Sequence, residues 1–264
     1  MTPLRSLLFF LFLFCASGRA EWTIAQRHDF GDLSGKIHAS ELLLNDAATE
    51  VEMQIIYFAP RDVRFQVALN LDGKIEGVRN AVDATAGIAG INGGYFESDL
   101  RPLGLLVSEG RTIHSVQRAK LLSGVFLVKQ GRPEIIRIQA LTSIKGIETA
   151  IQCGPFLVER GQPVPGLNAD RIAARTFVFS CGPGCWGFGI CRSATLAATG
   201  EIIAKAELIR DRPVIQALNL DGGSSTALYA KFDNREIYSE GRSIVSNYMI
   251  ISIARAGKAS GPTF

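Results

Sequence analysis

The residues best suited to chemistry lie in one short turn, Asp221-Gly222-Gly223-Ser224-Ser225, directly after the apolar run Val214–Leu220. The run is apolar enough to be a buried strand, so the turn places a carboxylate at the edge of the protein interior. Glycines allow a sharp backbone turn, and successive N–H groups in such a turn form a concave site for phosphate oxygens. Asp221 beside it is suited to act as a base, a nucleophile or a metal ligand. The alternative is a tight turn in which Asp221 only caps its own backbone.

A second glycine turn, Ile91-Asn92-Gly93-Gly94-Tyr95-Phe96, follows another short apolar run, Ile88–Ile91. Asn92 can hydrogen-bond sugar hydroxyls, and Tyr95 offers an apolar face to a sugar ring. Asn-Gly is also the strongest short signal for a β-hairpin, and for this turn alone the hairpin interpretation is favoured.

Arginines supply the positive charge that an anion site requires. Arg175 lies in the apolar segment Ala173–Val178, where a charge is costly to bury unless it is paired. A guanidinium matches a phosphate through two parallel hydrogen bonds, but Arg175 is also compatible with a charge on an edge strand. Arg242 and Asn247 flank the last apolar segment, where each belongs either to the site or to a solvated loop.

The elements that position these residues follow from the hydrophobic pattern. We predict helices over residues 73–86, with Asp72 as N-cap, and over residues 194–210, where Gly200 weakens the pattern. The rest consists of short runs bounded by Gly, Pro, Asn and Asp, which indicates an α+β fold of mixed or antiparallel β-sheets packed with a few helices in a single domain. The predicted strands are Met53–Phe58, Arg64–Asn70, Ile88–Ile91, Gly104–Val107, Leu122–Val128, Glu134–Ile138, Phe156–Val158, Arg175–Ser180, Trp186–Cys191, Val214–Leu220, Thr226–Ala230 and Tyr248–Ala254.

The first 20 residues have the pattern of a secretory signal peptide. The apolar run Leu7–Cys15 follows Arg5 and precedes Gly18 and Ala20, the small residues of a cleavage site. The run is too short to cross a bilayer as a helix. We therefore expect an exported chain, periplasmic or secreted, whose domain covers residues 21–264.

Charge and composition limit the partners. The chain has 28 Lys and Arg against 25 Asp and Glu, a net charge of +3, and no basic run suited to nucleic acid. No further segment reaches the ~18 uninterrupted apolar residues of a membrane helix, so no membrane span is expected after the signal peptide.

Taken in order, the segments resemble the phosphodiester glycosidase family, which includes the enzyme that uncovers mannose 6-phosphate and exported bacterial relatives. The resemblance covers residues 50–255 and nearly the whole exported chain. Ser224 stands where the family has a third glycine, and the segment Cys181–Cys191 has no counterpart in the family pattern. The resemblance rests on Ile91–Phe96, Pro102–Gly110, Gly154–Val158, Arg175–Thr176, Ala217–Ser225 and Arg242–Asn247.

The resemblance implies hydrolysis of a sugar-1-phosphodiester between the anomeric carbon and the phosphate oxygen. The leaving phosphate is already a stable anion, so the reaction needs less acid catalysis than an ordinary glycoside. Asp221 is then the carboxylate at the anomeric centre, Arg175 the phosphate clamp and Asn92 the residue that orients the sugar. The expected substrate-binding residues are Gly93, Gly94, Tyr95, Thr176, Gly222, Gly223, Ser224, Arg242 and Asn247. The expected partner is a sugar-phosphate or polysaccharide.

Two other functions fit part of the sequence. A serine hydrolase based on Ser224 or Ser225 needs a histidine, but none of the three histidines lies in a motif and no Gly-x-Ser-x-Gly occurs. A non-catalytic glycan- or polysaccharide-binding module, an accessory of exopolysaccharide processing, would keep the pocket without turnover. The presence of both Asp221 and Arg175 favours the enzyme.

The expected reaction requires no cofactor, and no ligand spacing demands a metal. Asp221, Asn92 and Asn219 nevertheless supply hard oxygen ligands, so a divalent cation, calcium or magnesium, is compatible with the site.

Cysteines form a separate pattern. An even number in an exported chain favours two disulfides, with three pairings open, over a structural zinc. The cysteines beyond the signal peptide are Cys153, Cys181, Cys185 and Cys191.

Overall fold

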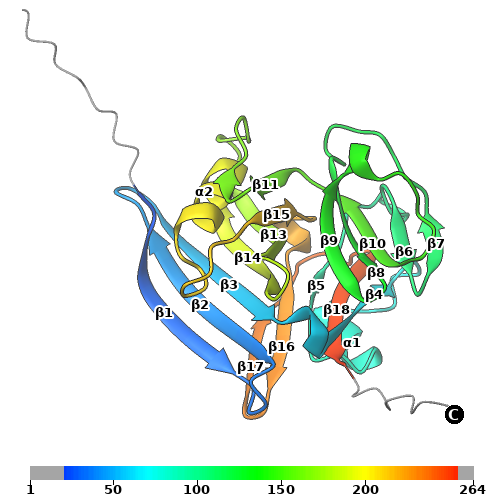
Figure 1. The fold of residues 1–264 in the computed structure, drawn as a ribbon, viewed down its shortest axis with the longest axis horizontal. Coiled ribbons are helices and arrows are strands. Elements are labelled where there is room, and N and C mark those ends of the chain that lie inside the picture. Colours follow the sequence, from blue (N-terminus) through cyan, green and yellow to red (C-terminus); the bar gives the residue numbers. More distant parts are fainter. Residues whose placement is uncertain (1–20, 255–264) are drawn as a thin grey trace, which may run out of the picture.

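The computed structural model describes residues 21–254, so the predicted signal peptide lies outside the described residues. Within this range the chain forms two α-helices and 18 strands in three antiparallel sheets (Figure 1). The predicted α+β class is confirmed. No helix of residues 21–254 is long and apolar enough to cross a membrane.

The largest sheet has eight strands in the order β1-β2-β3-β14-β13-β15-β11-β12. Strands β1, β2 and β12 of this sheet were not predicted. β1 is an edge strand with a mostly exposed, polar sequence that depends on pairing with β2. The strands are β1 Thr23–Gly31, β2 Ile37–Asn45, β3 Glu50–Phe58, β11 Phe156–Glu159, β12 Gln162–Pro163, β13 Ala173–Ser180, β14 Trp186–Ala194 and β15 Gln216–Asn219.

Two five-stranded sheets complete the β-structure. The second sheet has the order β7-β6-β10-β8-β9, and the third has the order β17-β16-β5-β18-β4. In Figure 1 the second sheet lies on the opposite side of the molecule from β1, β2 and β3. The strands are β4 Val63–Leu69, β5 Ala89–Asn92, β6 Leu106–Ser108, β7 Arg111–His114, β8 Gly124–Lys129, β9 Arg132–Arg137, β10 Ile147–Cys153, β16 Leu228–Phe232, β17 Arg235–Ser239 and β18 Asn247–Ile253.

Both helices are shorter than predicted. Helix α1, Gly77–Ala84, begins after Glu76, so the prediction of Asp72 as its N-cap is wrong. Asp72 instead forms an exposed ion pair with Lys74 at 2.7 Å, in a turn that delays the start of the helix.

Helix α2, Leu196–Lys205, begins at Thr195, whose hydroxyl accepts a hydrogen bond from the Ala198 N–H at 3.1 Å. Gly200 lies in the middle of this helix for a packing reason. A Cβ there would lie 2.9 Å from the Leu157 carbonyl oxygen, so the glycine lets α2 approach β11 closely. Three short 3-10 turns, Pro60–Asp62, Ile138–Ala140 and Gly223–Ser225, complete the elements described.

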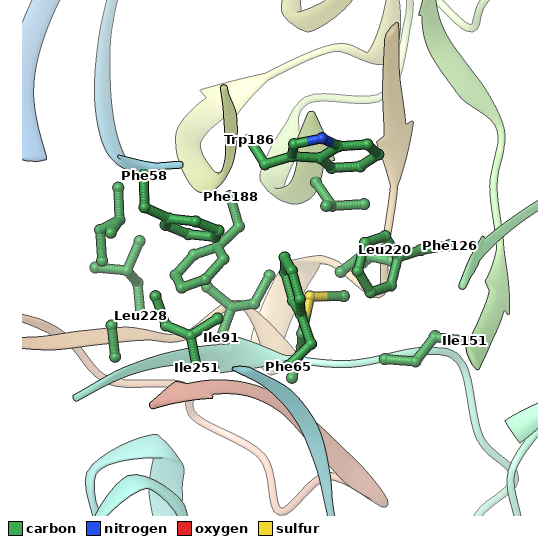
Figure 2. Packing of buried hydrophobic residues seen from close by; sticks show 14 of the residues in the cluster. Phe58, Phe65, Ile91, Phe126, Ile151, Trp186, Phe188, Leu220, Leu228 and Ile251 are labelled. Carbon is green, nitrogen blue, oxygen red and sulfur yellow. The ribbon is translucent and has the colours of Figure 1, made fainter. Parts of the chain in front are cut away.

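The main hydrophobic core lies between the three sheets (Figure 2). The Phe58 ring of the first sheet lies 5.6 Å from Phe65 of the third. Phe126 of the second sheet lies 5.2 Å from Phe65 and 6.0 Å from Trp186 of the first. Aromatic pairs at such centroid distances attract each other beyond their burial. The three sheets are therefore fixed relative to one another, and strand ends from different sheets meet in defined positions.

Candidate active site

The two glycine turns lie against each other at the ends of strands from different sheets. Strand β15 ends two residues before Asp221, and β5 ends at Asn92. The Asn92 Nδ2 donates to the Asp221 carbonyl at 2.7 Å across 129 residues of sequence. In return, the Asp221 N–H donates to the Gly93 carbonyl at 3.1 Å. These two hydrogen bonds join the turns into one unit.

Asn92 is the centre of this junction. It is fully buried, and its Oδ1 accepts hydrogen bonds from the Thr176 hydroxyl at 2.8 Å and from the Ala227 N–H at 3.1 Å. Its side-chain amide is thus bonded to three parts of the protein. The structure places Asn92 and Thr176 as residues that position the Asp221 turn.

The second turn is held in place by Asn247 and by the hydroxyl of its own Tyr95. A Cβ on Gly93 would lie 1.9 Å from the Asn247 Oδ1, which accepts a hydrogen bond from the Gly94 N–H at 3.0 Å. Asn247 is 1% exposed, and its Nδ2 has no hydrogen-bond partner within the described residues. The Tyr95 hydroxyl donates to the Gly154 carbonyl at 2.8 Å and accepts from the Asn219 Nδ2 at 3.1 Å.

Asp221 is half-buried at the start of its turn. Burial raises the pKa of its carboxyl, and hydrogen bonds from the Ser225 hydroxyl and the Gly222 N–H oppose that rise. The Gly222 N–H bond measures 2.9 Å. A buried carboxylate with a raised pKa is typical of catalytic acids and bases.

Arg175 lies beneath the turn. It is 8% exposed, its Nε donates to the Ala194 carbonyl at 3.0 Å, and its Nη2 donates to the Arg171 carbonyl at 2.5 Å. A Cβ on Gly222 would lie 2.7 Å from the Ala174 carbonyl oxygen, so the turn rests directly on β13. The guanidinium that was expected to clamp a phosphate is therefore engaged with the backbone that forms the floor of the site.

A cavity of about 480 Å³ opens beside the turn. The turn contributes Gly223 and Ser224 to its lining, whereas Asp221 is not among the lining residues. Arg192 and Arg242 border the same space together with Glu240. The Arg242 N–H donates to the Ser224 carbonyl at 2.7 Å, which holds the segment after β17 against the turn. The cavity is of a size that suits a small ligand.

Arg192 was not predicted as a site residue. Its Nη2 donates to the Ser239 hydroxyl at 2.8 Å, and its Nε lies 3.6 Å from a Glu52 carboxylate oxygen. Ser239 in turn donates to the Gln54 Oε1 at 2.7 Å. Arg192 follows an apolar stretch of β14, and only the pairing of β14 with β13 brings it beside the Asp221 turn. Nothing in the sequence around Arg192 indicates that its side chain lies beside the Asp221 turn.

The three histidines lie elsewhere. His114 contacts the Gly104 carbonyl at 2.9 Å, His38 stacks on Tyr57 at 5.1 Å, and His28 is exposed on β1. None of them lines the cavity beside Ser224. A serine nucleophile at this turn therefore has no histidine base.

The prediction of two disulfides is not met, because all four described cysteines are free. Cys153 is buried in the core between the sheets, whereas Cys191 is buried in a separate cluster under α2. Within residues 21–254 no group of three or more His, Cys, Asp or Glu could hold a metal ion, so the zinc alternative for the cysteines is also unsupported.

Comparison with known proteins identifies the family of the chain. The sequence model of the phosphodiester glycosidase family matches residues 85–251, which is more than half of the chain. The chain therefore belongs to the phosphodiester glycosidase family. Over 92 residues it is 32% identical to the uncharacterized protein YigE of Escherichia coli strain K12, a match that covers 32% of this chain and 36% of that protein.

Solved structures share the fold at low sequence identity. The catalytic domain of zebrafish N-acetylglucosamine-1-phosphodiester alpha-N-acetylglucosaminidase, auto-inhibited by its pro-peptide, superimposes with a TM-score of 0.59 and 18% identity, covering 90% of this chain and 85% of that one. A hypothetical protein from Synechocystis has a TM-score of 0.57 and 15% identity, covering 83% and 62%. A putative exported protein from Burkholderia pseudomallei K96243 has a TM-score of 0.55 and 11% identity, covering 80% and 74%.

Proposed function

We propose that this protein hydrolyses a sugar-1-phosphodiester and releases the free sugar and a phosphomonoester. The observation that carries the proposal is a half-buried carboxylate with a raised pKa, Asp221, in a turn whose following residues Gly223 and Ser224 line a cavity together with two arginines. Membership of the phosphodiester glycosidase family supports the same reaction type.

Phosphate binding falls to Arg242 and Arg192, which border the cavity, rather than to Arg175. A guanidinium binds phosphate oxygens through charge-assisted hydrogen bonds, and the N–H groups of the glycine turn add donors. Arg175 acts as a positioning residue that fixes β13 under the turn.

Asp221 acts in its ionised form at the anomeric carbon. The bond between that carbon and the phosphate oxygen breaks, and the electron pair leaves with the phosphate, which needs no proton at neutral pH. Asp221 either takes a proton from the attacking water or attacks the carbon itself, and in both cases its negative charge stabilises an oxocarbenium-like transition state. Asn92 keeps the Asp221 turn in place through its hydrogen bond to the Asp221 carbonyl.

The direct test is incubation of the purified protein with a panel of α- and β-linked sugar-1-phosphodiesters, followed by assay of released reducing sugar. We expect release from at least one member of the panel. Binding without release would favour the glycan-binding module. If no member of the panel is bound or hydrolysed, the proposal is wrong. A parallel series with a chelator tests the divalent cation that the oxygens of Asp221 and Asn219 are suited to bind.

Export is part of the proposal. It is supported by the signal-peptide pattern of residues 1–20 and by the structural likeness to a putative exported protein of Burkholderia pseudomallei. Cell fractionation with sequencing of the N-terminus should find the protein outside the cytoplasm with Glu21 as its first residue.

A further inference from the structure

Two cysteines face each other at the tip of the β13–β14 hairpin, away from the residues assigned to catalysis. The turn reads Cys181-Gly182-Pro183-Gly184-Cys185, directly beyond the paired residues Ser180 and Trp186. The Cys181 N–H donates to the Cys185 carbonyl at 2.9 Å. Residues opposite each other in an antiparallel pair direct their side chains to the same face.

The two thiols lie on the two sides of one tight turn, close enough for each to change the pKa of the other. A disulfide requires Cβ atoms about 3.8 Å apart, a separation within reach of opposed hairpin residues. Gly182 has a φ of +114°, and the Cys185 N–H donates to its carbonyl at 3.1 Å, so the turn already holds the two residues together. Closure of a disulfide here needs rotation of the side chains and no large backbone movement.

Arg212 makes the two thiols unequal. Arg212 and Cys185 line the same cavity. The pKa of the Cys185 thiol is lowered by the hydrogen bond from Cys181 and by the Arg212 charge, against the effect of burial, whereas the pKa of Cys181 is raised by its hydrogen bond with Cys185 and by burial. Thiolates are the nucleophiles in disulfide exchange, so Cys185 is the attacking thiol and Cys181 the resolving one.

Cys185 also lines a cavity of about 250 Å³ that shares no lining residue with the active-site cavity. Lys36, Arg61 and Arg212 border this space, and Asp62 is the one acidic residue among its lining. The Asp62 carboxylate lies 3.9 Å from the Arg61 Nε. The excess positive charge favours anionic ligands next to the Cys185 sulfur.

We propose that Cys181 and Cys185 form a thiol–disulfide exchange site that reacts with small anionic disulfides and closes to an intrachain disulfide. The Cys185 thiolate attacks one sulfur of the external disulfide, whose S–S bond breaks and releases one thiolate. Cys181 then loses its proton and attacks the Cys185 sulfur, displacing the second external thiolate. Two electrons pass from the cysteines to the external disulfide, which leaves as two thiols with the two protons that the cysteines lost.

The other cysteines serve as internal controls. Cys153 and Cys191 are each 0% exposed, in different hydrophobic clusters, and burial raises the pKa of both thiols. Neither is disulfide-bonded. In the folded protein we expect both to remain reduced while Cys181 and Cys185 react.

The test exposes the reduced chain to oxidised glutathione, an anionic disulfide, or to cystamine, a cationic one, at equal concentration and low salt. Differential alkylation and peptide mapping then identify each cysteine. We expect a Cys181–Cys185 cross-link that forms severalfold faster with oxidised glutathione. Cys181→Ser should stop at a mixed disulfide on Cys185, Cys185→Ser should block both steps, and Arg212→Gln should slow the reaction severalfold.

Arg210→Gln is the matched control for Arg212→Gln, because Arg210 is exposed and does not line the cavity beside Cys185. This variant should react like the unaltered chain. Two separately alkylated thiols after prolonged exposure of the folded protein would overturn the proposal, and so would a cross-link that includes Cys153 or Cys191. Equal rates with both disulfides would overturn the preference for anions.

Discussion

At the scale of the residue, Asp221 is a carboxylate whose surroundings act on its pKa in opposite directions. Burial disfavours the charged form and raises the pKa, while hydrogen bonds from Ser225 and Gly222 lower it, and the effect of burial is the larger. The side chain is therefore more basic than an exposed aspartate. That property suits a group that accepts a proton from water, and it has a consequence for stability as well as for activity.

We expect Asp221→Asn to abolish turnover without lowering the melting temperature at pH 7. A raised pKa means that the folded state binds the proton more tightly than the unfolded state, so the stability due to this group is lost as pH rises through the folded pKa. Asparagine does not ionise, so the variant does not lose this stability at pH 7. Turnover and thermal unfolding should be measured together, with Asp72→Asn at an exposed ion pair as the active control. Near-normal turnover would remove Asp221 from the mechanism.

The acid limb of the pH–rate profile reports the same group. In the proposed mechanism Asp221 acts in its ionised form, so kcat/KM should fall as pH drops through a pKa that lies above the ordinary 3.8. Ser225→Ala removes a hydrogen bond that favours the ionised form, so its acid limb should move to higher pH. If the acid limb of Ser225→Ala lies at the same pH as that of the unaltered chain, the assignment of this limb to Asp221 is wrong.

Arg192 should contribute to phosphate binding, although the sequence did not point to it. Hydrogen bonds to charged groups are worth about 1.5–3 kcal/mol, so Arg192→Gln should lower kcat/KM by about 10- to 100-fold. Arg101→Gln is the control, since Arg101 is exposed and only 3.7 Å from Asp99 in a surface pair. A normal kcat/KM for Arg192→Gln would assign the phosphate to Arg242 alone.

At the scale of the element, the β13–β14 hairpin serves both the core and the site. Its glycines allow close packing of neighbours, since a Cβ on Gly187 would lie 2.4 Å from the Ile56 carbonyl oxygen and equally close to the Phe179 ring. The far end of the same hairpin carries Ala174 and Arg192, which line the active-site cavity. The packing that fixes the strands therefore also fixes the cavity wall.

Gly187→Ala should destabilise the protein by about 1–3 kcal/mol, the usual cost of forcing an extra group into a packed core. Gly184→Ala, in the open turn of the same hairpin, should stay within about 0.5 kcal/mol of the unaltered chain. Urea unfolding of the two variants makes the comparison. Equal stabilities would show that β14 shifts to accept the methyl group.

At the scale of the whole molecule, polar contacts join sheets that the aromatic core already holds together. Arg137 of β9 forms two hydrogen bonds with Glu159 of β11, at 3.1 and 2.8 Å, and its guanidinium lies 4.3 Å from the centre of the Phe156 ring. The pKa of Glu159 is lowered chiefly by the hydrogen bond from Arg137. This ion pair links the second sheet to the first.

Glu159→Gln should lower the melting temperature slightly at neutral pH. Both side chains are more than a third exposed, at 39% and 37%, so the effect is about 1 kcal/mol or less. A lowered folded pKa gives stability that is present above the unfolded value of 4.5 and is lost as pH falls through the folded pKa. The difference between variant and unaltered chain should therefore vanish in acid and shrink in high salt. A difference independent of pH would show that the charge of Glu159 is not its cause.

The sequence by itself determined the local features of this protein. Alternation of apolar residues predicted most strands, and the two glycine turns with their flanking residues identified the family that the comparisons confirm. Both kinds of signal are local, since strand periodicity and the glycine requirement of a turn are properties of neighbouring residues. The same local patterns gave the correct fold class.

The tertiary structure alone decided which side chains meet. Asn92 ties its turn to Asp221, Arg175 bonds to backbone beneath the site, and Arg192 takes a place on the cavity wall. Each of these positions depends on strand register and on sheet packing between segments far apart in the chain. A change of register by one residue would turn every side chain of a strand to the other face of the sheet. The residues next to them in sequence do not indicate such long-range contacts.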